Sequence, residues 1–465
     1  MKDYLTSITP DSFSGIIFAF EGIRRTVTLL NGPTGCKFYH SATSDNQVIR
    51  QLEFEPLRFP ATWYFGQPRV PCTYLDSKDY VYGSMGKLEE ALVFLRENVS
   101  FDLLCIVNSP GAALIGDNLE GIAKSVLGDA LCLTIETPGF SEDICSGYET
   151  AALSLIRNFA RIKNGAAPES STEQKHIIIP QHNIAQNPDH TFDNRRALCA
   201  TTVPKTVNIL GLSIYHRNFK GDSAELERLL SLCGITVNCI LCADCTMEQI
   251  ESLSSADLNI ILHPEYAMKT ALLLYEMFDT PYYACDGLPV GFKAAEKFIQ
   301  DICKLLACDP SPILLESEMA RARVYPFISR VHSLSGLPKG VPFAVEGTYS
   351  ELYAYTKFLI EYFGMVPDCA SVLNSEHDET KAQYLDLLRE YGFEHIMERD
   401  ILDTAAEIIF ASGITISKLK LRPHEFTGVE ISLPTMGYID VIPKTNIGIN
   451  GALQLVEQVL NGLLF

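Results

Sequence analysis

The sequence has few basic residues for its length. It contains 37 Lys and Arg against 57 Asp and Glu in 465 residues, a net charge of 37 − 57 = −20. Surfaces that bind nucleic acids or anionic membranes need clustered Lys and Arg, so neither is expected as a partner. The 14 cysteines are too few for a disulfide scaffold in so long a chain.

Long hydrophobic runs are also missing. The N-terminus lacks a basic stretch followed by an apolar core, and the apolar run at 15–22 is interrupted by Glu21. That run is far shorter than the roughly 18 residues that cross a bilayer. We therefore expect a cytoplasmic protein without membrane contact, whose cysteines stay reduced unless they bind metal.

The usual nucleotide and hydrolase motifs are absent. The stretch from Gly83 to Lys87 has neither the spacing of a P-loop nor the Ser or Thr that follows its Lys. No GxGxxG follows an expected strand, and neither GxSxG nor HExxH occurs. We expect no nucleotide on this chain.

Alternation of short β-rich runs with helical spacing predicts the fold class. In the middle of the chain, strands are expected at 207–212, 235–242, 258–263 and 281–287, each followed by a helical segment. The pattern recurs on both sides and ends in a helix at 450–464. It predicts three doubly wound α/β domains with parallel sheets flanked by helices, at 1–200, 205–310 and 335–465. Their boundaries fall near 170–205 and 310–340, and a substrate or cofactor cleft is expected between the domains.

The turn at 32–36 is the most informative local motif. A strand leads into Gly32-Pro33-Thr34-Gly35-Cys36, and a helix is expected to follow. At a helix N-terminus the dipole lowers the pKa of a thiol and favours the thiolate, the form that binds metal. The alternative is a buried structural cysteine in a turn.

Further motifs share an order with Cys36. Cys72 begins the segment CTYLDSKDYVYG (72–83), NSPGAALIGDN (108–118) follows an expected strand, and TIETPGFSEDICSGYETA spans 134–151. Together with segments that continue to the C-terminus, these resemble the nitrogenase component 1 family over nearly the whole chain. The resemblance implies the same three-domain α/β fold.

The resemblance also implies an iron–sulfur reductase. In the family a cluster bridges two component 1 subunits and receives electrons from an ATP-dependent iron–sulfur partner. Cys36 and Cys72 match two ligand positions, but Ser109 or Pro110 stands in the place of the third. We therefore expect one [4Fe–4S] cluster between two chains, each contributing Cys36 and Cys72, in a homodimer or in a heterotetramer with a paralogous subunit.

The family's dinitrogen-reducing cofactor is not expected here. That cofactor is held by a Cys and a His, yet this chain has His263 after the strand LNIIL, and its 434–451 segment contains no His. His263 is a candidate metal ligand or substrate contact, with a satisfied polar residue as the alternative. Members without the cofactor bind other substrates, such as tetrapyrroles.

The run Cys239-Ile-Leu-Cys242-Ala-Asp-Cys245 is not explained by the resemblance. Its spacing can place three thiolates on one metal cluster, although the fourth cysteine of a ferredoxin is missing. The alternative is core packing for Cys239 and a loop role for Cys242 and Cys245.

Two further candidates follow expected strands, where open α/β sheets bind their ligands. They are Tyr215 with His216, and Glu346 with Gly347 and Thr348. His216 or Glu346 would donate protons during reduction, and solvated or capping roles are the alternative.

The main hypothesis is the catalytic component of a nitrogenase-like two-component reductase acting on a small molecule. Two alternatives are a non-catalytic scaffold for metallocofactor assembly, and a small-molecule binding protein that has lost the cluster.

Overall fold

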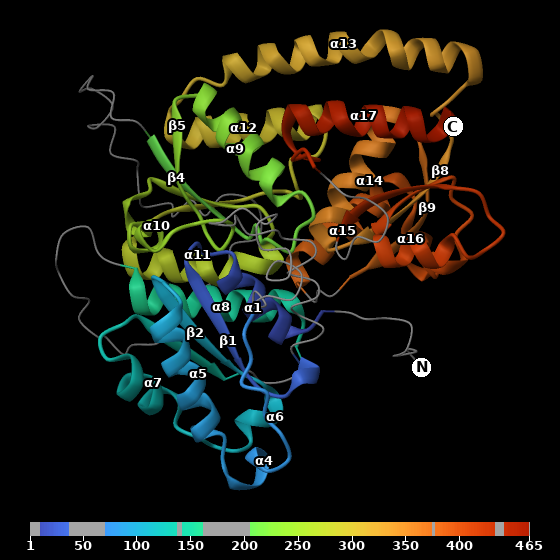
Figure 1. Ribbon diagram of the computed structural model, residues 1–465. Helices are drawn as coiled ribbons and strands as arrows, with labels where there is room; N and C mark the ends of the chain where they lie inside the picture. The colour runs from blue at the N-terminus through green and yellow to red at the C-terminus, as the bar shows by residue number, and fades with distance from the viewer. Residues whose placement is uncertain are drawn as a thin grey trace.

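The structure contains three parallel β-sheets flanked by helices. The computed structural model describes residues 10–36, 70–136, 142–160, 205–373, 377–432 and 441–464. Figure 1 shows the N-terminal sheet at the bottom and the middle and C-terminal sheets side by side above it. Every pair of neighbouring strands runs parallel within these sheets. The prediction of a parallel α/β fold is therefore confirmed.

The N-terminal sheet has the strand order β1-β2-β3. Its strands are β1 (Thr26–Asn31), β2 (Leu103–Asn108) and β3 (Cys132–Glu136), and its helices are α4 (Asp79–Tyr82), α5 (Met85–Asn98), α6 (Pro110–Ala113) and α7 (Leu119–Leu127). All residues of β1 and β2 are buried, as expected for strands covered on both faces.

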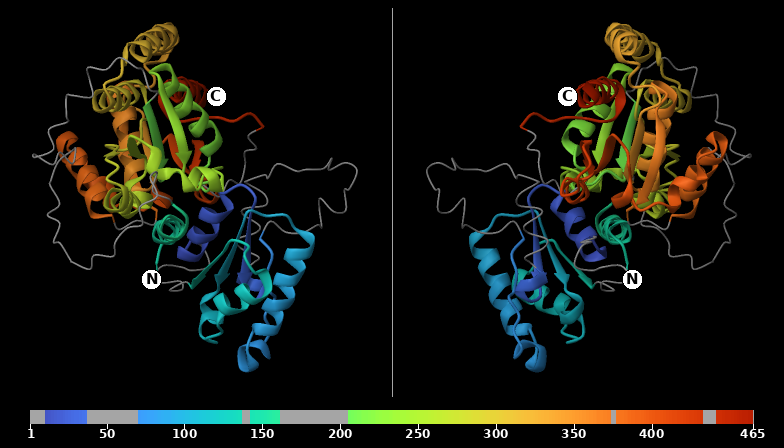
Figure 2. Two further views of the ribbon diagram at one scale, coloured as in Figure 1. Left: turned by 90° about the vertical axis from the view of Figure 1, so that its left-hand side faces the viewer. Right: turned by 90° about the vertical axis from the view of Figure 1, so that its right-hand side faces the viewer.

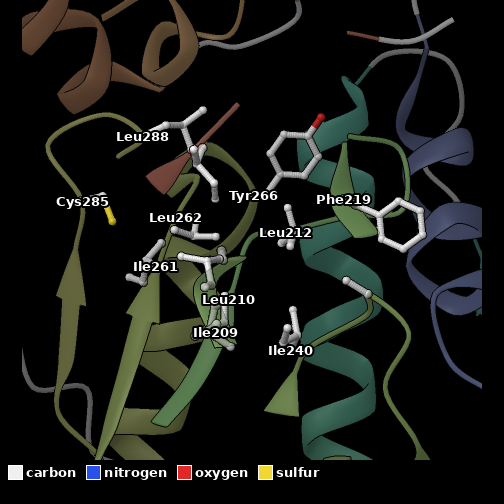
Figure 3. Close-up of a cluster of buried hydrophobic side chains, with 14 of the residues drawn as sticks. Ile209, Leu210, Leu212, Phe219, Ile240, Ile261, Leu262, Tyr266, Cys285 and Leu288 are labelled. Atoms are coloured by element: carbon white, nitrogen blue, oxygen red, sulfur yellow. The ribbon is translucent and has the colours of Figure 1, made fainter. Parts of the chain in front are cut away.

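The middle sheet has the order β5-β4-β6-β7. Its strands are β4 (Lys205–Leu210), β5 (Ile235–Ile240), β6 (Leu258–Ile261) and β7 (Tyr282–Ala284), and its helices are α9 (Phe219–Leu232), α10 (Met247–Glu251), η3 (Leu253–Ser255), α11 (Pro264–Phe278) and α12 (Phe292–Leu306). Apolar side chains from β4, β5, β6 and the following loops form its core, as Figure 3 shows.

The C-terminal sheet has the order β11-β10-β8-β9. Its strands are β8 (Pro342–Gly347), β9 (Val366–Val372), β10 (Ile408–Ser412) and β11 (Thr427–Ser432), and its helical segments are α14 (Tyr349–Phe363), α15 (Asp378–Tyr391), η4 (Glu394–Glu398), η5 (Ile401–Asp403), α16 (Gly413–Leu419) and α17 (Gly448–Leu464). In this sheet and the middle one, the first strand lies between the second and the third. The chain therefore reverses its direction of winding beside the first strand, and ligands of such sheets bind at that point.

Two helices connect the N-terminal and middle sheets. α1 (Ser12–Glu21) packs along α8 (Ile144–Phe159), and α8 in turn contacts α11 (Figure 2). The two backbones touch, because a Cβ atom on Gly147 would lie 1.8 Å from the carbonyl oxygen of Ser12. All residues of α1 are buried, so its sequence has no polar face and reads only as an apolar run.

A long helix occupies one of the predicted domain boundaries. α13 (Ser311–Ser335) packs on α12 and α17 where the sequence predicted a boundary near 310–340 (Figure 1). The other boundary, near 170–205, lies almost wholly outside the described residues, as does the TPGF part of the 134–151 motif. The three domain ranges stay predictions. Of the described helices, none combines the length and apolarity that a membrane span requires.

The contact between α1 and α8 generates a stability prediction. Gly147→Ala forces the helices apart, because the new methyl group overlaps the Ser12 carbonyl, and we expect it to lower the free energy of unfolding by about 3 kcal/mol. Gly86→Ala in α5 is the control, because nothing lies within 4 Å of its Cβ position. It should be neutral or stabilising by about 0.5–1 kcal/mol. Urea unfolding of both variants checks this, and equal stabilities would contradict it.

Candidate functional site

Cys36 and Cys72 lie together at the carboxyl end of β1. The segment that contains Cys72 pairs with the end of β1: the Leu30 N–H donates to the Pro71 carbonyl at 2.9 Å, and the Thr73 N–H donates to the Leu30 carbonyl at 3.0 Å. Cys36 follows in the turn after β1, and the two thiols interact electrostatically. Two cysteines that are well separated in sequence are thus brought to one sheet edge.

The thiol of Cys72 is buried among backbone groups. Its Sγ donates to the Gly32 carbonyl at 3.1 Å and accepts from the Tyr74 N–H at 3.3 Å. Cys36 is half-buried. The expected lowering of its pKa is wrong, because burial raises the pKa of the Cys36 thiol and the neighbouring Cys72 raises it further. Desolvation of the thiolate therefore outweighs any helix dipole at this position.

Ser109, which with Pro110 is one of the two candidates for the third family position, has a capping role. Its Oγ accepts from the Ala112 N–H at 3.3 Å at the start of α6, and its side chain packs over Gly32. Tyr80 hydrogen-bonds to Ser109 and interacts electrostatically with both cysteines, while burial raises the pKa of the Tyr80 hydroxyl. Ser109 and Tyr80 therefore belong to the surroundings of the two thiols.

A buried amide network fixes this sheet edge. The Asn31 Nδ2 donates to the Asn108 Oδ1 at 3.0 Å across β1 and β2, and the Thr73 Oγ1 donates to the Asn31 Oδ1 at 2.9 Å. Ser84, at the start of α5, donates through its N–H and its Oγ to Asp117 at 2.6 and 2.7 Å. Asp117, in the LIGD part of the 108–118 segment, thus anchors α5 and does not face the thiols.

The two thiols suit thiolate ligation of an iron–sulfur cluster. Two thiols, one buried and one half-buried, are at one edge, and thiolates are the ordinary ligands of such clusters. Within the described ranges, no group of three or more His, Cys, Asp or Glu side chains is arranged to hold a metal ion. The described residues at this edge therefore offer two thiolate ligands, Cys36 and Cys72.

His216 and His263 meet at the winding reversal of the middle sheet. His216 follows β4 and His263 follows β6, and these strands are neighbours. Their imidazole rings stack with centroids 4.1 Å apart and planes 10° apart. The edge of Tyr266 contacts both rings, at 4.9 Å and 5.9 Å between centroids. The strand-end positions predicted from the sequence are thus side by side.

Both imidazoles are held neutral. The Ser213 N–H donates to His216 Nδ1 at 3.0 Å, so the proton of the neutral ring is on Nε2. Burial lowers the pKa of His216 to about 3, and burial together with His216 lowers the pKa of His263 well below its ordinary value. Among the described residues, neither His216 Nε2 nor His263 Nδ1 has a hydrogen-bond partner, although both atoms are buried. Such atoms are expected to meet a ligand or water.

Glu346 at the C-terminal sheet is fully engaged in the protein. Its Oε1 accepts from the N–H and Oγ of Ser412 at 3.1 and 2.9 Å, and its Oε2 accepts from the Thr415 Oγ1 at 2.9 Å. Burial raises the pKa of Glu346. Thr348 caps α14 by accepting from the Glu351 N–H. A capping role, the alternative given for Glu346 and Thr348, therefore fits these residues at the end of β8.

The three cysteines of the CxxCxxC run are buried where the middle sheet meets α1. Cys239 lies in β5, Cys242 has a left-handed backbone (φ +58°), and Cys245 pairs with Ile23 after α1. A hydrogen bond from the Cys239 thiol to the Cys245 sulfur raises the pKa of Cys239 and lowers that of Cys245. This packing resembles the core-and-loop alternative, and the metal role of the run stays a prediction.

Sequence reasoning missed the polar groups in first turns of helices. Tyr266 and Glu265 belong to the first turn of α11, and Glu265 accepts from the N–H and Oγ of Ser350 at 2.8 and 2.6 Å, which joins the middle and C-terminal sheets. Burial raises the pKa values of Asp222 and Glu351 to about 7. The candidates from the strand-end rule end at His216, His263 and Thr348, two to six residues before these positions.

A cavity of about 260 Å³ lies between the loop after β7 and α14. Its lining contains neither His216 nor His263, and none of the cysteines predicted to bind metal. It is therefore separate from the two strand-end sites.

The neutral state of His216 generates a pH prediction. The folded pKa of about 3 lies below the ordinary 6.5, so the unfolded chain binds more protons between these values, and His216 makes stability fall as pH falls through this window. His216→Gln removes that contribution and should reduce the loss of stability between about pH 7 and pH 5. Urea unfolding at both pH values measures it, with the exposed His395→Gln as control. An unchanged pH dependence in His216→Gln would contradict the neutral assignment.

The amino-acid sequence is similar to those of known proteins over much of the chain. A subunit of the light-independent protochlorophyllide reductase from Rhodopseudomonas palustris (strain TIE-1) is 28% identical over 202 residues, 43% of this chain and 32% of the relative. The corresponding subunit from Heliobacterium modesticaldum (strain ATCC 51547 / Ice1) is 25% identical over 297 residues, 61% of this chain and 56% of the relative. The aligned regions thus span between about a third and just over half the length of these relatives.

Solved structures cover the whole chain, and a family profile covers nearly all of it. Structures of nitrogenase Cp1 at pH 6.5 and pH 5 match with TM-scores of 0.72 and 0.68 at 16% and 15% identity, covering 100% of this chain and 94% and 90% of theirs. At that identity the match shows the fold. The profile described as "Nitrogenase component 1 type Oxidoreductase" matches residues 12–464. The chain therefore belongs to the nitrogenase component 1 type oxidoreductase family, as the resemblance predicted.

Proposed function

We propose that this protein is the catalytic component of a nitrogenase-like two-component reductase. It receives low-potential electrons from an ATP-dependent iron–sulfur partner and passes them through a [4Fe–4S] cluster to a small molecule. The observation that supports this most is the meeting of Cys36 and Cys72 at one sheet edge in a chain of this family. No nucleotide site is proposed on this chain.

Four thiolates would hold the cluster, Cys36 and Cys72 from each of two chains. When bound, the cluster supplies one-electron relay. The Tyr74 N–H already donates to the Cys72 sulfur, and such hydrogen bonds stabilise a thiolate ligand. Burial disfavours the free thiolate of Cys36, so binding iron is what would compensate its charge. The second chain is an identical copy in a homodimer or a paralogous subunit in a heterotetramer.

The proposed substrate is a tetrapyrrole-like or other small molecule rather than dinitrogen. The curated relatives are named as protochlorophyllide reductase subunits, and His263 stands where the dinitrogen-reducing members have a Cys. His216 would donate a hydrogen bond from Nε2 to an acceptor atom of the substrate, and His263 would offer its Nδ1. Because burial keeps His216 neutral, it would orient the substrate rather than deliver a proton from an imidazolium.

A scaffold for metallocofactor assembly is the competing function. Turnover of a tetrapyrrole panel by the anaerobic protein with its reduced partner component separates the two. Protochlorophyllide, from the relatives' names, is the first substrate to use. Consumption of substrate that depends on the partner and ATP supports the enzyme, and transfer of an intact metallocofactor without turnover supports the scaffold.

Removal of one thiol tests the cluster site. Cys36→Ala and Cys72→Ala should each lose most of the bound iron and the cluster's EPR signal in anaerobically purified protein, because each chain would be left with one ligand. Cys308→Ala is the matched control, since Cys308 is a partly exposed thiol after α12, and it should keep its iron. Full iron content in either Cys36→Ala or Cys72→Ala would refute the proposed ligand set.

A further inference from the structure

A cavity between the middle and C-terminal sheets is not used by the proposed function. It lies between the loop that follows β7 and one side of α14, with a volume of about 260 Å³. Two glycines with left-handed backbones bring the loop close to the helix. A Cβ atom on Gly287 would lie 2.5 Å from the Tyr353 ring, and one on Gly291 would lie 2.2 Å from the Phe358 ring. The close approach is therefore specified by the sequence of this loop.

Aromatic rings form the walls of the cavity. Phe358 and Tyr362 stack with centroids 5.3 Å apart and planes 15° apart, and Tyr362 also contacts Phe292 at 5.4 Å. Tyr283 and Phe298 form a second aromatic pair at 6.3 Å. In the same loop, the buried Cys285 and Leu288 lie beyond the carboxyl end of β6 (Figure 3). A flat apolar ligand would find ring faces on more than one side.

Lysines outnumber carboxylates among the residues that line the cavity. Its lining holds Lys293, Lys297 and Lys357 against Asp286 and Glu361, a balance of 3 − 2 = +1 in a chain of net charge −20. Lys297 is paired with Asp301 at 2.6 Å and with Asp286 at 3.2 Å, and Lys293 is paired with Glu361 at 3.5 Å. These pairs neutralise two of the three lysines.

Lys357 is the lysine that is not neutralised. Its Nζ donates to the Tyr353 hydroxyl at 3.0 Å and lies 5.1 Å from the centre of that ring. No carboxylate of the described residues lies within ion-pair distance of it. Burial lowers the pKa of Lys357, but the hydrogen bond to Tyr353 and the more distant Glu361 and Asp286 outweigh burial and raise the pKa overall. The half-buried ammonium stays charged, with two of its three donors available.

We propose that this cavity binds a small aromatic carboxylate of one or two rings. The ring would occupy the space beside Phe358 and Tyr362, and the carboxylate would accept from the Lys357 Nζ. A single unpaired ammonium neutralises one negative charge, which is the charge of a carboxylate. A phosphate would bring about two negative charges to a site that can neutralise only one. The volume lies near the lower end of ordinary ligand sites, which are roughly 300–1,000 Å³, and so favours a small ligand.

Titration with indole-3-acetate tests the proposal. Isothermal titration calorimetry of the full chain should show one saturable site, and indole-3-acetamide, which has the same ring without the charge, should bind about tenfold or more weakly. Lys357→Met keeps the apolar stem and removes the ammonium, and it should weaken indole-3-acetate binding by a similar factor. Lys304→Met is the matched control, because Lys304 of α12 is exposed and lies outside the cavity lining. It should leave the affinity within about twofold of the wild type.

The possible results are decisive in either direction. Absence of saturable binding, equal binding of acid and amide, or equal affinity of Lys357→Met and the wild type would each overturn the proposal. Anaerobic iron content is measured on the same variants. Lys357→Met should keep the iron of the wild type, so loss of this ligand site and failure of the proposed cluster are distinguishable.

Discussion

Parallel pairing of the strands is the constraint on which the sites of this protein depend. In a parallel sheet all carboxyl ends meet at one edge, so residues far apart in sequence become neighbours once the register is set. Leu30 of β1 pairs with the segment of Cys72, which places that thiol beside the turn of Cys36. β4 pairs with β6, and this places His216 on His263. Loss of the pairing at Leu30 would separate Cys72 from Cys36, and loss of the β4–β6 register would separate His216 from His263.

Burial then decides what each group at these edges can do. Glu346 lies at the carboxyl end of β8, and His216 lies in the loop after β4. Three donors from β10 and α16 satisfy the Glu346 carboxylate, while His216 Nε2 has no partner among the described residues. The first group therefore anchors a helix, and the second is open to a ligand. The cysteines follow the same rule, since desolvation raises the pKa of Cys36 despite its place after a tight turn.

Much of the fold could be predicted from the sequence, because strand and helix periods are local properties. The helix predicted at 450–464 is observed as α17 (Gly448–Leu464), and His216 and His263 follow β4 and β6 as the sequence predicted. α1 was not recognisable, since a helix buried on every side has no polar stripe. α13 stands where a boundary was predicted, because Pro326 and its exposed face weaken the helical pattern. The partners of Glu346, the tautomer of His216 and the Lys357 cavity depend on tertiary contacts, which no local pattern encodes.

The central claim is that two chains share one cluster through two cysteines each. Native mass spectrometry of the anaerobically purified protein measures the ratio of cluster to chain directly. The account predicts a species of two component 1 chains that carries one Fe₄S₄ unit, with no cluster on the separated single chain. A single chain that retains a complete Fe₄S₄ unit of its own, or a two-chain species with a separate cluster on each chain, would contradict it.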